Sequence, residues 1–317
     1  MKTFVNPDRK DWPVLLKRPQ MEVTDLYGKV EKILAEIRQT GDIALKKFTQ
    51  KFDGVDLKQF KATNSEIKKA ASLVDTELKE AILLAYKNIE KFHAAQKTDV
   101  SKIETSPGVT CWQKPVAIEK AGLYIPGGTA PLLSTVLMLA IPAQIAGCRQ
   151  IVLCTPPAKD GNVHPAILYA ANLSGVNAVF KLGGVQAIGA MAYGTESVPK
   201  MDKIFGPGNQ FVTAAKQLVS MNDVAIDMPA GPSEVMVVAD NSANPAFVAS
   251  DLLSQAEHGV DSQVVLITES EQFVKKVQQE VDKQIEMLPR KELAKKSLNN
   301  SLAIVAESLQ YRMDIIN

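Results

Sequence analysis

Residues 244–259, NPAFVASDLLSQAEHG, carry polar side chains at a spacing that could bind a metal ion. An asparagine suits the N-cap of a helix, a proline suits its first turn, and Gly259 suits the left-handed residue that ends it. At about 100° per residue, Asp251, Gln255 and His258 fall within an arc of roughly 60° on this predicted helix. One helix face therefore gathers a carboxylate, an amide and an imidazole.

An imidazole and an oxygen ligand at positions i and i+3 can form half of a Zn2+ site. A histidine near the C-terminal end of a helix also often binds the last carbonyls or interacts with the helix dipole. The segment alone leaves both interpretations open, because a zinc ion needs more donors than these.

Four glycine-rich turns, each between a predicted strand and a predicted helix, are a second group with a chemical role. Glycine lets the backbone approach a ligand closely, and the N-terminus of a helix favours phosphate, so a nucleotide ligand is expected. None of the turns matches the dinucleotide pattern GxGxxG, and turns of this composition also serve simply to reverse the chain. The turns are YIPGG at 124–128, LGG at 182–184, FGPGN at 205–209 and MPAGPSE at 228–234.

Side chains in or beside these turns have types that suit the binding of a cofactor or substrate. Tyr124 could stack on a ring, Gln186 and Asn209 could bind ribose or amide groups, and Ser233 is a small donor. Cys154 ends a predicted strand, where an α/β enzyme can carry a nucleophile. Free cysteines are commonly buried, however, so packing is the favoured interpretation of Cys154.

Short β-branched runs that end at glycine or proline alternate with helical patterns from residue 116 onward, which predicts parallel sheets covered on both faces. The chain before them is helical and charged, with amphipathic patterns at 25–52 and 64–96. The predicted strands are 120–125, 150–154, 178–182, 203–205, 235–239, 263–268 and 302–305. The predicted helices are 132–146, 165–173, 185–193, 210–219, 245–258 and 271–287.

The composition excludes several functional classes. Lys plus Arg (36) nearly balance Asp plus Glu (35), so no surface for nucleic acid or an anionic membrane is expected, and a small molecule is the expected partner. The three cysteines lack the spacing of a disulfide framework, which favours a cytoplasmic location. Residues 121–148 carry no charge, but their prolines and glycines leave no uninterrupted helix long enough to span a membrane.

Together these motifs resemble the histidinol dehydrogenase family. The resemblance runs nearly from end to end, through GDIALKKFTQKFD, GLYIPGGTAPLLSTVLMLAIPAQIAGC, ESVPKMDKIFGPGNQFV, AIDMPAGPSEV and SDLLSQAEHG. GPGN and AGPSE followed by SQAEHG form a combination far more specific than any single glycine turn.

The expected architecture is α/β, with two Rossmann-like domains whose parallel sheets are incomplete, as in aldehyde dehydrogenases, preceded by an N-terminal helical segment. The first domain is expected to be discontinuous, at residues 1–119 with 235–317, and to include the N-terminal helices. An NAD-binding domain is expected to be inserted at residues 120–234.

The resemblance implies the oxidation of L-histidinol to L-histidine by two NAD+ through histidinaldehyde, with Zn2+ as a second cofactor and a homodimer as the assembly. It implies that Gln255 and His258 are zinc ligands and that Asp251 is only a neighbour. The implied contacts are those of Tyr124, Gln186 and Asn209 with NAD, and those of Ser233, Gln255 and His258 with the substrate.

The sequence departs from the family at its C-terminal end. Further toward the C-terminus, the family carries a Glu-His pair for acid/base work, and an Asp and a His that complete the zinc shell, the last donated across a dimer. The sequence ends at Asn317, before these residues, so no catalytic residue is assigned and the truncated chain is expected to lack activity. Glu257 and His258 also form a Glu-His dipeptide, but it belongs to the zinc motif.

Two other functions stay open from the residues alone. One is a different NAD-linked aldehyde oxidoreductase that uses Cys154 as its nucleophile, for which loss of activity on alkylation would be the mark. The other is a non-catalytic module for nucleotide binding or subunit association, which would bind NAD without turnover.

Overall fold

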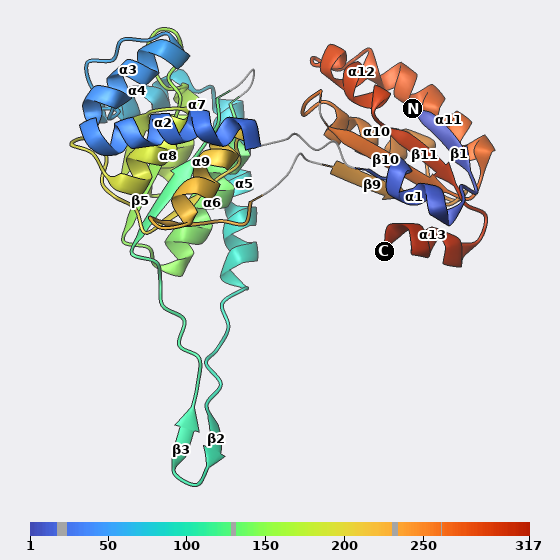
Figure 1. Ribbon diagram of the computed structural model, residues 1–317, viewed down its shortest axis with the longest axis horizontal. Helices are drawn as coiled ribbons and strands as arrows, with labels where there is room; N and C mark the ends of the chain where they lie inside the picture. Colours follow the sequence, from blue (N-terminus) through green and yellow to red (C-terminus); the bar gives the residue numbers. More distant parts are fainter. Residues whose placement is uncertain (18–23, 128–130, 230–233, 261) are drawn as a thin grey trace. The chain divides into compact units, whose positions relative to one another are not determined.

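The structure is a computed structural model that describes residues 1–17, 24–127, 131–229, 234–260 and 262–317. The chain divides into two compact units, one of residues 22–229 and one of residues 1–21 with 230–317. Each unit is built on its own parallel sheet with helices on both faces (Figure 1). The expected α/β class with parallel sheets is therefore confirmed.

The sheet of residues 22–229 has five parallel strands in the order β6-β5-β4-β7-β8. Numbered along the unit, this is the order 3-2-1-4-5 of a doubly wound fold, in which ligands bind where the chain direction diverges at the carboxyl ends of the strands. That point lies between β4 and β7 in this sheet. The strands are β4 (Lys120–Tyr124), β5 (Gln150–Thr155), β6 (Ala178–Lys181), β7 (Lys203–Phe205) and β8 (Ala225–Ile226).

Helices cover both faces of this sheet in two layers. One face carries α6 (Leu133–Ala146) and α7 (Pro165–Leu173), with α4 (Asn64–Leu73) and α5 (Thr76–Ala94) outside them. The other carries α8 (Gly184–Tyr193) and α9 (Gln210–Ser220), with α2 (Thr24–Thr40) and α3 (Asp42–Asp53) outside. Because α8 lies between the sheet and α2, its uncharged sequence GVQAIGAMAY is buried on all sides.

The expected domain boundary is wrong for residues 22–119. The helices α2 to α5 pack on the five-stranded sheet, so they belong with the predicted cofactor domain and not with the discontinuous one. Their apolar stripes explain the difference, since Leu34 and Ile37 of α2 and Phe48 of α3 are buried in the same core as α8. Gly189 of α8 allows this close packing, because a side chain there would meet Leu34 and Ile37.

A β-hairpin that the sequence did not predict follows α5. Its antiparallel strands, β2 (Ile103–Ser106) and β3 (Val109–Cys111), stand at the end of two extended segments and project away from the sheet (Figure 1). All their residues are exposed, including apolar ones. We call residues 98–117 the arm.

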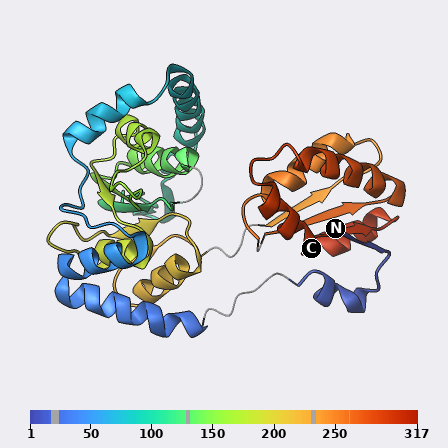
Figure 2. The same cartoon turned by 90° about the horizontal axis from the view of Figure 1, so that it is seen from above.

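The second unit holds a four-stranded parallel sheet in the order β1-β11-β10-β9, so its edge strand comes from the start of the sequence. Its strands are β1 (Lys2–Val5), β9 (Glu234–Val238), β10 (Gln263–Thr268) and β11 (Leu302–Val305). One face packs on α10 (Pro245–Ala256), α11 (Glu271–Ile285) and α12 (Lys291–Asn299). The other face packs on the short α1 (Trp12–Leu15), which follows the 3-10 helix η1 (Arg9–Asp11), and on α13 (Leu309–Ile316) (Figure 2).

The uncharged stretch 121–148 forms a strand and a helix inside the first of these units. It contains β4 and the 14-residue α6, with Pro142 within the helix. Among the described helices, none combines the length and the apolar character that crossing a bilayer requires.

Candidate cofactor and metal sites

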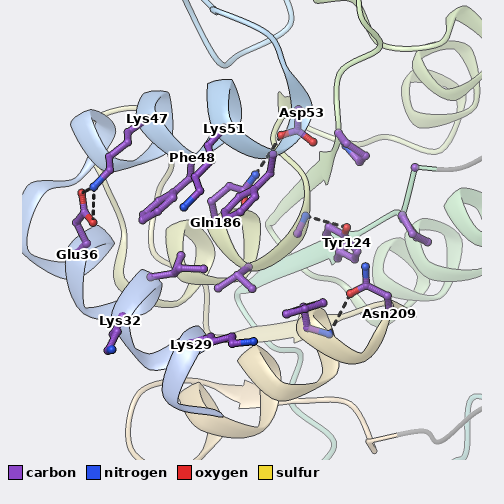
Figure 3. Close-up of a pocket in the computed structure, with 18 residues that line it drawn as sticks. Lys29, Lys32, Glu36, Lys47, Phe48, Lys51, Asp53, Tyr124, Gln186 and Asn209 are labelled. Carbon is purple, nitrogen blue, oxygen red and sulfur yellow. Dashed lines mark hydrogen bonds and ion pairs between the residues drawn. The ribbon is translucent and has the colours of Figure 1, made fainter. Parts of the chain in front are cut away.

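A pocket of about 780 Å3 opens at the carboxyl edge of the five-stranded sheet (Figure 3). Tyr124, Gln186 and Asn209, the three predicted cofactor residues, all line it. Tyr124 ends β4, Gln186 lies on the first turn of α8 after β6, and Asn209 follows β7. Because parallel strands end at the same edge of a sheet, three turns that are distant in sequence meet at one place.

Tyr124 stands at the end of β4 and is 3 % exposed. Its hydroxyl oxygen accepts a hydrogen bond from the Gly184 N–H, over 3.0 Å, at the start of α8. Burial raises the pKa of Tyr124 to about 12, so the phenol stays protonated at neutral pH. Its O–H is therefore available as a donor to a ligand in the pocket.

Gln186 lies on the first turn of α8 and is 1 % exposed. Its Nε2 donates to Asp53 Oδ2 over 3.1 Å, which fixes the orientation of the amide. Its Oε1 is buried and has no hydrogen-bond partner among the described residues. A buried acceptor without a partner costs roughly 1–3 kcal/mol, so this atom indicates a ligand that donates a hydrogen bond.

The turn at 206–209 is held by an ion pair of a buried lysine and a partly exposed aspartate. Gly206 donates its N–H to Asp227 Oδ2 over 2.8 Å, and its carbonyl accepts from Lys216 Nζ over 2.9 Å. Lys216 and Asp227 also pair with each other. Gly206 has a φ of 129°, and a side chain there would collide with the Tyr124 carbonyl, so the turn needs glycine.

Asn209 follows this turn and caps α9. Its Oδ1 accepts from the backbone N–H groups of Phe211 and Val212, both over 3.1 Å. This leaves the side-chain Nδ2 as a donor toward the pocket that Asn209 lines.

The sequence analysis missed the wall of the pocket that comes from α2 and α3. Asp53 and Phe52 of α3 line the pocket, and so do four lysines of these two helices. Lys47 pairs with Glu36, at 2.6 Å between Nζ and Oε1. Amphipathic helices with surface lysines are common, and only the segment GDIALKKFTQKFD, noted there for its family resemblance, marked this region. The lysines are Lys29, Lys32, Lys47 and Lys51.

Burial raises the pKa of the Asp53 carboxyl to about 6, against the smaller lowering by its hydrogen bond with Gln186. Asp53 is half-buried, and the pKa of such a carboxyl indicates that its ionised form is poorly compensated. Burial of the ionised Asp53 carboxylate therefore lowers the stability of the folded protein, and a ligand that donates hydrogen bonds to it would offset this loss.

The predicted metal ligands lie in the other unit, on or just after a helix whose start agrees with the prediction and whose end does not. Asn244 caps α10, accepting from the Ala246 N–H over 3.0 Å, but α10 ends at Ala256, and Gly259 is not among the described glycines with positive φ. Gln255 is 9 % exposed and donates to Ser262 Oγ over 3.5 Å. His258 follows the helix and is exposed.

The donors at the end of α10 do not complete a zinc site by themselves. No group of three or more His, Cys, Asp or Glu side chains that could hold a metal occurs within the described parts of the chain. Asp251 is exposed one turn earlier on α10, and Ser233 lies outside the described residues. Gln255 and His258 therefore remain two candidate ligands that need further donors.

Cys154 does not fit the nucleophile interpretation. It is fully buried within β5, and burial raises the pKa of its thiol far above the usual value. A thiol that stays protonated beneath the sheet surface cannot attack a substrate, so packing explains this residue.

We expect Asp53→Asn to stabilise the ligand-free protein at high pH. The pKa of Asp53 is raised in the folded protein, so the ionised carboxylate destabilises the fold as pH rises through about 6. Below the unfolded-state pKa near 3.8, the carboxyl is neutral in both the folded and the unfolded protein. Denaturant unfolding should show a gain of about 1 kcal/mol at pH 8, allowing for partial exposure, and none at pH 3.5. A gain that is the same at both pH values would contradict this account of Asp53.

Known proteins resemble this chain along its whole length. The sequence model of the histidinol dehydrogenase family matches residues 16–317. A histidinol dehydrogenase of Bacteroides thetaiotaomicron is 60 % identical over 317 residues, which are 100 % of this chain and 74 % of that protein. One of Campylobacter jejuni is 53 % identical over 99 % of this chain and 73 % of its own length. The crystal structure of the Elizabethkingia anophelis histidinol dehydrogenase matches with a TM-score of 0.97 and 52 % identity, over 100 % of this chain and 73 % of that one.

Proposed function

This chain belongs to the histidinol dehydrogenase family of oxidoreductases in histidine biosynthesis, and we propose that it binds NAD for the oxidation of L-histidinol to L-histidine by two NAD+ through histidinaldehyde. The observation that carries the proposal is the convergence of Tyr124, Gln186 and Asn209 on one pocket. A volume of about 780 Å3 lies within the range of pockets that bind cofactors.

The residues of the pocket fit a dinucleotide. Gln186 offers a buried acceptor that has no partner among the described residues, while Tyr124 and Asn209 offer donors. The lysines of α2 and α3 place positive charge around it, as a pyrophosphate requires. When bound, NAD supplies the hydride acceptor, and the protein supplies binding and orientation.

We expect Asn209→Ser to weaken NAD+ binding while leaving α9 intact. Serine is as good an N-cap as asparagine, but it lacks the amide donor that we assign to the cofactor. Loss of one such hydrogen bond should raise the Kd for NAD+ about tenfold in titration calorimetry, without a change in melting temperature.

The matched control is Asn244→Ser, which replaces the same residue type in the same N-cap role on α10, in the other unit. It should leave the Kd for NAD+ unchanged. Equal effects of the two substitutions, or no binding of NAD+ by the unaltered chain, would contradict the proposed cofactor site.

We also propose that Gln255 and His258 supply two ligands to a Zn2+ ion. A carboxamide oxygen and a neutral imidazole are acceptable zinc donors, and the end of α10 brings them close in sequence. When bound, zinc would orient the imidazole and amine of histidinol. Two donors alone make a weak site, so this part of the proposal requires ligands beyond those described.

We expect this chain to bind Zn2+ with a Kd of about 1 µM or weaker, since structural zinc sites gain their affinity from four ligands. His258→Ala should abolish that binding in competition with a chromophoric chelator. His164→Ala is the control, because this histidine caps α7 through its Nδ1. Tight binding that survives His258→Ala would place the metal elsewhere.

We propose a homodimer in which the arm packs against the second copy. A two-stranded hairpin that buries no apolar face is marginally stable in water, so an arm of this length requires a partner surface. Trp112 is 54 % exposed and Val116 is 77 % exposed on it. A second copy is an occupant that is always available to a chain, and closed pairs are the commonest assemblies of soluble proteins.

We expect the double substitution Trp112→Ser and Val116→Ser to weaken self-association at least tenfold in sedimentation equilibrium, because each side chain loses an apolar contact. Phe247→Ser is the control, since Phe247 is 72 % exposed on α10 and away from the arm in sequence. If the arm variant and the control associate alike, the arm is not the interface.

We place the protein in the cytoplasm. Its three cysteines are free, and Cys154 is buried in β5. Unpaired thiols of this kind suit a reducing compartment.

A further inference from the structure

The turn at 206–209 has a sequence that does little to fix its own backbone. It reads Gly-Pro-Gly-Asn, in which the glycines have wide conformational freedom and the proline has no N–H to donate. Gly206 also has a φ of 129°, which residues other than glycine rarely adopt. The turn nevertheless leads to Asn209, which lines the cofactor pocket. Its conformation must therefore be fixed by residues outside the turn.

Two charged side chains from different elements supply this restraint. Asp227 directly follows β8 and accepts from the Gly206 N–H over 2.8 Å, while Lys216 of α9 donates to the Gly206 carbonyl over 2.9 Å. Asp227 is itself held in place by its backbone N–H, which donates to the Ile204 carbonyl of β7 over 3.1 Å. The Lys216–Asp227 pair closes this set of contacts around Gly206. Neither charged residue is among those that line the pocket.

Lys216 is a charged residue at a position that packing alone would fill with an apolar one. It is 6 % exposed, and the other buried residues of α9 are all small or apolar, namely Val212, Ala214, Ala215 and Val219. Taking a lysine and a carboxylate out of water costs about as much free energy as their attraction returns, and apolar residues of similar volume often stabilise a fold as well. The geometry that the pair imposes on Gly206 therefore explains it better than any stability that it adds.

Gly206 transmits this geometry to two of the proposed cofactor contacts. On one side it packs so closely on Tyr124 that a side chain at Gly206 would collide with the Tyr124 carbonyl. On the other side it lies three residues before Asn209, whose Oδ1 is bound by the first N–H groups of α9. A rotation of the backbone at Gly206 would displace both contacts. The pair thus determines whether their donors are in place before a ligand arrives.

We propose that Lys216 and Asp227 act together as a positioning pair for the dinucleotide, raising its affinity by holding the 206–209 turn in the binding conformation before the cofactor arrives. The inference rests on the proposed NAD site, and it adds two residues that act through Gly206 and not by contact with the ligand. Without the pair, the turn would be ordered only on binding, and the entropy lost in ordering it would reduce the affinity.

The test measures the Kd for NAD+ by titration calorimetry, and the melting temperature in parallel, for Lys216→Met and for Asp227→Ala. Methionine keeps an unbranched apolar stem but removes the donor to the Gly206 carbonyl, and alanine removes the acceptor from its N–H. Each substitution should raise the Kd about tenfold. Asp227 is partly exposed, so its variant still tests the proposal if Lys216→Met does not fold.

The matched control is Lys181→Met, which removes another ion pair of a buried lysine and a partly exposed carboxylate in the same unit. Lys181 at the end of β6 is 7 % exposed and pairs with Glu66 of α4, and neither residue lines the cofactor pocket. This substitution should lower the melting temperature about as much as Lys216→Met does. It should leave the Kd for NAD+ within about twofold of the unaltered chain, because the 206–209 turn keeps its restraint.

A double substitution tests whether the two residues act as one unit. Lys216→Met with Asp227→Ala should weaken NAD+ binding about tenfold, like either single change, because both restrain the same residue. A loss of about a hundredfold, an unchanged Kd in the single variants, or an equal loss in Lys181→Met would overturn the proposal. Those results would leave the cofactor site standing, whereas no binding of NAD+ by the unaltered chain would overturn the site and the pair together.

Discussion

The backbone of Gly206 is the constraint on which the cofactor pocket depends. Its N–H and its carbonyl belong to two successive peptide groups and are bound by the two members of one ion pair, Asp227 and Lys216, so both peptide groups are held in orientation. The same residue lies against the carbonyl of Tyr124, which leaves no room for a side chain. The ends of β4 and β7 are thus held at a fixed separation, at the point where a doubly wound sheet opens.

The helices α2 and α3 add a further wall to that opening. A sheet edge with glycine turns offers backbone and a few polar tips, but it offers little charge or aromatic surface. In this unit the lysines and Phe52 come from helices that pack on the outside of α8. Asp53 links this outer wall to the sheet edge, because it accepts a hydrogen bond from Gln186 at the start of α8.

The local sequence pattern was sufficient to predict most of the strands and helices and to select three residues that line the pocket. The hydrophobic runs of β4 to β7 and the cap at Asn244 depend on residues adjacent in sequence, so they could be predicted. The place of Asp53 in the pocket could not be predicted, because it arises from packing that brings α3 to α8 and not from its neighbours in sequence. The domain boundary failed for the same reason, since the apolar stripe of α2 does not say which sheet it covers. The edge strands β1 and β8 lack an apolar run, since β1 is KTFV and β8 has only two residues.

The pairing of β1 with β11 has a consequence for how the molecule is made. Lys2 lies opposite Leu302 in a parallel register, so β1 can pair with β11 only after the long segment between them has been synthesised. The unit of residues 22–229 is continuous and can fold while the rest is still being translated. During that interval β1 has no neighbouring strand, so the sheet of the discontinuous unit is completed only after β11 has been made.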